Sequence, residues 1–221
     1  MKRLLSGIVF LILSFSGWAQ TKADLGIFGG VSYYMGDINP KKQFYSPGFT
    51  LGGIYRYNFD PHFSLRASML FSDLSADDLD FNNNFQQQRR ANFDTEVVDL
   101  ALQVEFNFQP FWVPKKSRTK GLVPYVTGGI GYIAPTSTGS SLTIPMGAGL
   151  KFNLPGRWSG AFEWSFRKSF TDDLDNLDDP FDLNQKSIAH NNDWVSFVGV
   201  IITYKLFPDN EECHSYDRFV R

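Results

Sequence analysis

The sequence predicts an all-β protein, an eight-stranded antiparallel transmembrane β-barrel whose polar lumen is filled by side chains. Three observations predict this fold: a leader typical of exported proteins, segments of about ten residues that alternate apolar and polar side chains, and a high aromatic content. The chain has 221 residues, enough for one domain, and 16% of them are aromatic. Its mean hydropathy of -0.22 excludes a bundle of membrane helices, whereas alternating lipid-facing and lumen-facing strands produce such a value.

Residues 1–19 have the features of a cleaved signal peptide. A positive start, an apolar stretch and two small residues follow one another: Lys2 and Arg3, residues 4–15, then Gly17 and Ala19. Small residues in this spacing mark a cleavage site. The apolar stretch is too short to span a bilayer, which leaves a retained N-terminal helix as the weaker alternative. We therefore expect the chain to be exported.

The first three segments, 24–34, 49–59 and 63–72, each have an apolar and a polar face. The apolar faces carry Leu25, Ile27, Val31 and Tyr33, then Leu51, Tyr55, Tyr57 and Phe59, then Phe63, Leu65, Ala67, Met69 and Phe71. The polar faces carry Asp24, Arg56 and Arg66. Asp60-Pro61-His62 predicts a tight turn before the third segment. Strict alternation of this kind predicts strands with two different environments.

The next three segments, 98–108, 124–133 and 144–154, continue the pattern. The polar face of the first of them carries Asp99, Gln103 and Glu105. Such groups are costly in a dry core but natural in a polar lumen. The segment 124–133 is rich in glycine and alternates less clearly. The segment 144–154 places Lys151 and Asn153 on its polar face.

The last two segments, 158–167 and 194–206, complete the predicted barrel. In the former, Trp158, Phe162, Trp164 and Phe166 alternate with Ser159, Ala161, Glu163, Ser165 and Arg167. In the latter, the face opposite Trp194 is also apolar, since it carries Val195, Phe197 and Ile201. A polar lumen does not explain this face. Aromatic residues at the segment ends are typical of interfacial girdles: Tyr33, Phe59, Phe63, Phe108, Trp158, Trp194 and Tyr204.

An even number of strands lets the barrel close with both chain ends on one side of the membrane. We expect the barrel to span 20–207, with a periplasmic tail at 208–221. The long connections 74–92 and 169–192 then face outward, whereas the basic connection 109–122 lies on the periplasmic side. An exported soluble β-sandwich is the alternative, but its strands are usually shorter.

Charged residues of both signs lie on the predicted inward faces. They are Arg56, Arg66, Lys151, Arg167, Asp24, Asp99, Glu105 and Glu163. A barrel this narrow is filled by side chains, and ions inside it must be paired. We therefore predict an interior ion-pair network of Arg56, Arg66, Asp99, Glu105, Lys151, Glu163 and Arg167. The alternative is an ion path, but we predict no open pore.

We predict no enzymatic activity, metal site or cofactor. His190 and Ser187 lie near several acids in one connection, which leaves a lipid hydrolase as a weak alternative. The acidic segment 171–182 carries carboxylates of the kind that bind calcium, but it lacks the glycine and the closing glutamate of a calcium loop. We therefore expect a solvated loop. Basic residues do not gather into a nucleic-acid-binding surface.

The predicted tail 208–221 carries Cys213, the single cysteine of the chain. A single cysteine excludes a disulfide within the chain. In an oxidising compartment, it suggests a bond to another chain or a free thiol. We expect the tail to dock on a periplasmic partner, with Cys213 as a candidate contact or intermolecular disulfide. The alternative is a disordered tail with an idle thiol.

Several segments resemble PorG-type barrels of the Bacteroidetes type IX secretion system. They are 29–40, 55–59, 105–108, 124–125, 163–175 and 192–194. The most specific is 163–175, in which Glu163-Trp164-Ser165-Phe166-Arg167 leads into the acidic segment. The resemblance covers nearly all of the mature chain, although 134–141 is shorter than the corresponding loop of that family.

The resemblance implies a non-enzymatic component of the secretion machinery, embedded in outer-membrane lipids. It also implies two protein partners, a periplasmic ring lipoprotein and the partner protein of that lipoprotein. The alternative is a free-standing small outer-membrane barrel that serves envelope stability or adhesion.

Overall fold

The computed structural model describes residues 22–36, 39, 42–81, 84–90, 92–111, 121–136, 139–170 and 194–206. Several predictions fall outside the described residues. They concern the signal peptide 1–19, the acidic segment 171–182, the neighbourhood of His190 and Ser187, and the tail 208–221 with Cys213.

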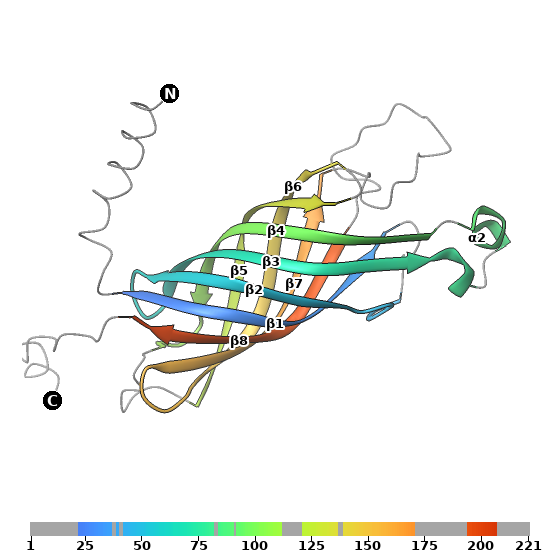
Figure 1. Ribbon diagram of the computed structural model, residues 1–221. Coiled ribbons are helices and arrows are strands. Elements are labelled where there is room, and N and C mark those ends of the chain that lie inside the picture. The colour runs from blue at the N-terminus through green and yellow to red at the C-terminus, as the bar shows by residue number, and fades with distance from the viewer. Residues whose placement is uncertain are drawn as a thin grey trace, which may run out of the picture.

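Within the described residues, eight antiparallel strands form a closed barrel, as the sequence predicts (Figure 1). The strands are β1 (Ala23–Met35), β2 (Gly48–Asn58), β3 (Phe63–Asp77), β4 (Asn92–Asn107), β5 (Leu122–Pro135), β6 (Ser141–Asn153), β7 (Trp158–Ser169) and β8 (Trp194–Lys205). Each strand pairs with its neighbours in sequence, and β8 pairs with β1 to close the ring. No described helix has the length and apolar character that crossing a membrane requires.

The strand ends define two ends of the barrel. At the terminal end, β1 begins beside the end of β8, and the Leu206 N–H donates to the Ala23 carbonyl at 3.0 Å (Figure 1). The predicted turn at Asp60 also lies here. Its carboxylate accepts hydrogen bonds from the Phe63 N–H at 2.8 Å and the His62 N–H at 2.7 Å, which hold the pKa of Asp60 below its usual range. We call the opposite end the distal end.

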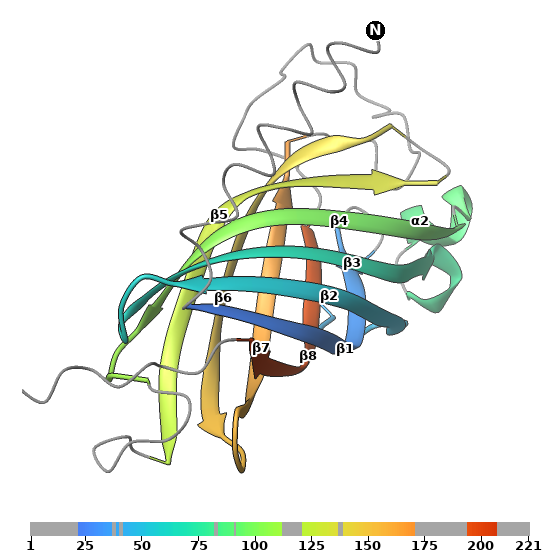
Figure 2. The same ribbon diagram turned by 60° about the vertical axis from the view of Figure 1, so that its left-hand side comes forward.

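At the distal end, the hairpin of β3 and β4 is longer than the sequence predicted. We expected a connection over 74–92, but β3 continues to Asp77, which pairs with Asn92 of β4. A 3-10 turn, η2 (Asp78–Asp80), and a short helix, α2 (Asn84–Arg89), close this hairpin (Figures 1 and 2). The prediction failed because the pattern inverts beyond Ser72: the outward residues Asp73, Ser75 and Asp77 are polar, whereas the inward Leu74 and Ala76 are apolar.

Exposed and buried residues alternate along the strands, so the barrel has an apolar outer face and a closed interior. On β3, Phe71 is 52% exposed, whereas the neighbouring inward residue Leu70 is only 3% exposed. Exposed apolar side chains occur on every strand, including Ile27, Leu51, Phe63, Leu102, Ile130, Leu142, Phe162 and Val200. The outer surface is therefore apolar around the barrel, as the predicted alternation requires.

The interior contains an apolar cluster as well as polar groups. Phe28, Ile54, Leu70 and Leu74 belong to it together with Val195, Phe197 and Ile201 of β8. This cluster explains the β8 face that a purely polar lumen left unexplained, because those three side chains pack inside the barrel. The lumen is thus filled by side chains of both kinds.

Tyr33 differs from its predicted place in an exposed girdle. Alternation on β1 turns Tyr33 outward, but the side chain is fully buried. The Phe44 ring packs against it at 5.0 Å between centroids, and its hydroxyl donates to Gln43 Oε1 at 2.6 Å. The segment that follows β1 therefore folds back over the outer face, a contact between loop and wall that strand alternation cannot predict.

Two adjacent glycines of β1 provide a test of how closely the wall is packed. A methyl group on Gly30 would lie 2.2 Å from the Val198 carbonyl oxygen, whereas none of the atoms described lies within 4 Å of a methyl group on Gly29. We expect Gly30→Ala to lower the free energy of unfolding by about 1–3 kcal/mol through this overpacking. Gly29→Ala should unfold like the wild type.

Urea titration of both variants in detergent micelles would measure this difference. Equal midpoints for Gly30→Ala and Gly29→Ala would contradict the close approach of β1 and β8.

Candidate functional site

The interior ion-pair network centres on Glu105, which β4 turns into the lumen. Its side chain is fully buried and forms ion pairs with three cationic side chains among the described residues. Arg56 Nε lies 2.8 Å from Oε2, Arg66 Nη1 lies 3.1 Å from Oε1, and Lys151 Nζ lies 2.6 Å from Oε2. One carboxylate thus joins β2, β3 and β6 to β4.

Strand register explains why an acid is required at this position. Arg56 and Arg66 lie directly opposite each other in the pairing of β2 with β3, and both are fully buried. Like charges in this relation destabilise a sheet. Glu105 lies between them and contacts both guanidinium groups, so it offsets their repulsion.

Glu163 extends the network across the lumen from β7. Arg66 Nη1 and Nη2 donate to its two carboxylate oxygens at 2.5 and 3.0 Å. The Tyr125 hydroxyl donates to Oε2 at 2.6 Å, and Gln103 Oε1 accepts a further bond from Arg66 at 2.8 Å. A forked guanidinium that meets a carboxylate in this way forms a strong, directional pair.

The remaining charges nearest the terminal end are also partnered. Asp24 Oδ2 lies 3.8 Å from Arg56 Nη1 and accepts a hydrogen bond from Asn58 Nδ2 at 2.8 Å. Lys151 donates to Asn107 Oδ1 at 2.8 Å, and its ammonium lies 4.5 Å from the centroid of the Tyr125 ring. These contacts compensate the loss of hydration that burial imposes.

Arg167 and Asp99 form a separate pair nearer the distal end. Arg167 Nε lies 3.2 and 3.1 Å from the two oxygens of Asp99. The guanidinium carbon lies 5.0 Å from the centroid of the Phe197 ring, so the cation also packs against an aromatic face. This pair lies where the polar network meets the apolar cluster.

The structure therefore brings the predicted residues together in two groups. Arg56, Arg66, Glu105, Lys151 and Glu163 share one network, whereas Asp99 and Arg167 pair with each other. Sequence reasoning placed Gln103 on the inward face but not in the network, and it missed Tyr125 as a polar member. Tyr125 could have been found, since alternation with its neighbours Pro124 and Val126 places it on the inward face, but glycines obscured that pattern.

This arrangement holds strands together and fills the lumen, and it offers no site for a cation. Glu105, Glu163 and Asp99 already face arginine or lysine at hydrogen-bonding distance, and the side chains that meet in the network come from strands on opposite sides of the lumen. Among the described residues, no group of three histidine, cysteine or carboxylate side chains is placed to hold a metal ion.

Glu163→Leu tests the contribution of the network. Removing the carboxylate leaves the Tyr125 hydroxyl without its acceptor and deprives Arg66 of two hydrogen bonds. We expect the free energy of unfolding in detergent to fall by about 3–5 kcal/mol. Phe162→Leu is the matched control, because Phe162 is the adjacent outward residue, 49% exposed. An unchanged melting curve for Glu163→Leu would count against the network.

Comparison with solved structures finds small barrels, of which Neisserial surface protein A shares this fold. Neisserial surface protein A is 8% identical, with a TM-score of 0.53, and the match covers 83% of this chain and 96% of that chain. The N-terminal β-barrel domain of Pseudomonas aeruginosa OprF is 14% identical, with a TM-score of 0.44 and coverage of 84% and 98%. Ail, the attachment invasion locus protein of Yersinia pestis, is also 14% identical, with a TM-score of 0.42 and coverage of 84% and 99%.

At these identities the likeness extends to the fold alone. Comparison with curated proteins finds no match. One family model matches residues 2–216, which include the whole barrel. The chain therefore belongs to the family described as a domain of unknown function, DUF6089.

Proposed function

We propose that this protein is a non-enzymatic barrel of the outer membrane that spans the bilayer without an open pore. The observation that carries the proposal is the exposed apolar surface around a closed ring of strands. On β3 this surface runs from Phe63 to Phe71 and ends at the exposed Asp73. Such a run covers roughly 27 Å along the strand, or about 20 Å across the membrane at a strand tilt of about 40°, which is comparable with an apolar band of about 25 Å.

The buried network supports the absence of a pore. Arg66 of β3 meets Glu163 of β7 across the lumen, and the side chains of both are almost completely buried. An aqueous channel along the axis would expose these charges to water. In the proposed protein, the network closes the lumen and stabilises the barrel in the membrane.

We further propose that the protein is a component of the type IX secretion machinery. It would anchor a periplasmic ring, formed by a lipoprotein and its partner protein, to the outer membrane. The support is the resemblance of 163–175, of which Glu163 and Arg167 are the inward charges of β7. In this proposal the terminal end faces the periplasm, and the tail with Cys213 contacts the ring.

A free-standing barrel that serves envelope stability or adhesion is the second candidate. The observation that favours it is the β3–β4 hairpin, which carries polar outward residues beyond the apolar surface. Such a hairpin would project from the membrane on the side opposite the terminal end.

Purification from the native outer membrane tests the secretion role. Affinity-tagged protein should retain the ring lipoprotein after mild detergent extraction, and deletion of 208–221 should reduce its recovery. Cys213→Ser should remove any larger species that non-reducing gels show. A solitary barrel that purifies without the lipoprotein, with or without its tail, would contradict the secretion role and leave the free-standing barrel.

Protease treatment of intact cells tests the orientation. We expect cleavage within 78–91 or 171–193, because the proposed topology places these connections outside the cell. The connection 108–121 should be cut only after the outer membrane is opened. Cleavage of intact cells confined to 108–121 would mean that the terminal end faces outward.

A further inference from the structure

The β3–β4 hairpin presents an open strand edge beyond the barrel wall. The pairing of β4 with β5 stops at Val97, which lies opposite Pro135, and one further bond runs from the Thr136 N–H to the Glu96 carbonyl at 2.9 Å. Beyond this bond, Asn92 and Asp94 pair with β3 alone among the described strands. Because Glu96 turns its carbonyl toward β5, alternation turns the backbone groups of Asp94 and Asn92 to the same open side.

The other edge of the hairpin is covered. Beyond the start of β2, the Ser32 hydroxyl donates to the Asp73 carbonyl at 2.9 Å, and the Ser46 and Ser75 hydroxyl groups lie 2.7 Å apart. The Tyr45 hydroxyl accepts from the Asp77 N–H at 3.1 Å. Proteins usually cover or blunt exposed strand edges. In this hairpin, described residues cover the β3 edge but not the β4 edge.

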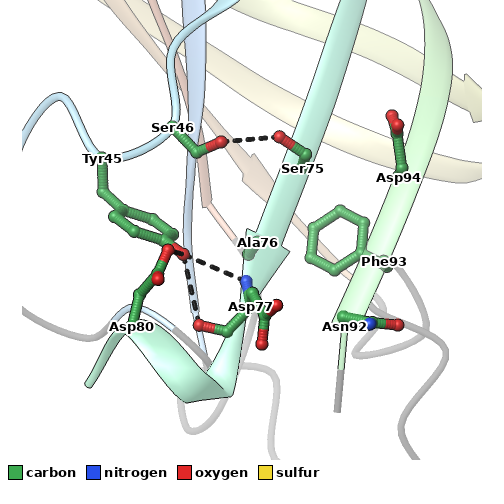
Figure 3. Close-up of a pocket in the computed structure, with 9 residues that line it drawn as sticks. All are labelled: Tyr45, Ser46, Ser75, Ala76, Asp77, Asp80, Asn92, Phe93 and Asp94. Carbon is green, nitrogen blue, oxygen red and sulfur yellow. Dashed lines mark hydrogen bonds between the residues drawn. The ribbon is translucent and has the colours of Figure 1, made fainter. Parts of the chain in front are cut away.

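A pocket of about 320 Å³ lies at this hairpin (Figure 3), and residues of both faces line it, among them the inward Ala76 and Phe93. Tyr45 and Ser46 line one side, and Asn92 and Asp94 line the side next to the open edge (Figure 3). The carboxylates of Asp77, Asp80 and Asp94 all belong to its lining. A strand added at the open edge would place alternate side chains on the outer face of the hairpin, beside the exposed Asp94 and Glu96.

Tyr45 maintains the pocket on the side away from the edge. Its hydroxyl donates to Asp80 Oδ2 at 2.7 Å. Burial is the larger cause, and this hydrogen bond the smaller one, that raises the pKa of Tyr45 to about 12. Phe44 and Ser46 on either side of it have φ angles of 56° and 43°. Such backbone angles are unfavourable for these residue types and persist where surrounding contacts hold them. The wall of the pocket is therefore fixed by its own contacts.

We propose that Asn92–Asp94 is a docking edge for an extended, cationic polypeptide segment of another protein. Main-chain hydrogen bonds to the open edge would supply strand addition, and lysine or arginine side chains on the outer face would reach the carboxylates of Asp94 and Glu96. Charge complementarity selects this occupant over a second copy of the same hairpin, whose outward Asp94 and Glu96 would repel their counterparts. The proposal is independent of what binds at the terminal end.

A capped synthetic hexapeptide that alternates lysine with valine is a suitable probe. The full barrel in detergent micelles should bind it, with amide chemical shifts changing at 92–96. Methylating the backbone nitrogens on one edge of the peptide keeps its charge but removes its donors, and should weaken binding by about tenfold. Replacing lysine with glutamate should abolish binding.

Asp94→Asn should weaken binding of the lysine peptide by about threefold. Asp60→Asn is the matched control, because it makes the same change in net charge at the terminal end and should bind as the wild type does. The proposal would be overturned if Asp94→Asn and Asp60→Asn bound the lysine peptide equally well, or if the methylated peptide bound as tightly as the unmethylated one. Either result would show only a general electrostatic attraction. Absence of peptide binding, with self-association of Asp94→Asn, would show instead that the acids only protect the edge.

Discussion

Much of this structure depends on one constraint, the need to neutralise two arginines that β2 and β3 bring face to face inside a narrow barrel. Arg56 and Arg66 cannot be solvated there, and each requires an acid within hydrogen-bonding distance. Glu105 lies between them, and Glu163 reaches Arg66 from the far wall. The strands that carry these acids must therefore hold one register, since a slip by one residue would turn the charges toward the outer face.

The sequence predicted most of the barrel because the two faces of each strand differ so strongly. Alternation identified the inward charges and the apolar outer surface, and turn residues separated the strands. It failed at the β3–β4 hairpin, where outward Asp73 and inward Leu74 reverse the expected polarity. A pattern that assumes apolar residues outside and polar groups inside cannot recognise a strand whose outward residues are polar.

The candidate site was predictable in its members but not in its connections. Alternation shows that Glu163 and Arg167 share a face, but it does not show that one pairs with Arg66 and the other with Asp99. Those pairings depend on how strands distant in sequence tilt across the lumen. Tyr33 illustrates the same limit, because its burial depends on Phe44, a loop residue whose position no periodic pattern specifies.

The pair of Arg66 and Glu163 also has a consequence for how the chain assembles. Arg66 and Glu105 lie on adjacent strands and can meet in a hairpin, whereas Glu163 is 97 residues away in sequence. Until β7 joins the sheet, Arg66 and Tyr125 lack an acceptor that they use in the finished barrel. The interior is thus fully neutralised only when β7 has joined and the sheet has curled far enough for Glu163 to reach Arg66, so an open sheet carries an electrostatic cost that the closed barrel does not.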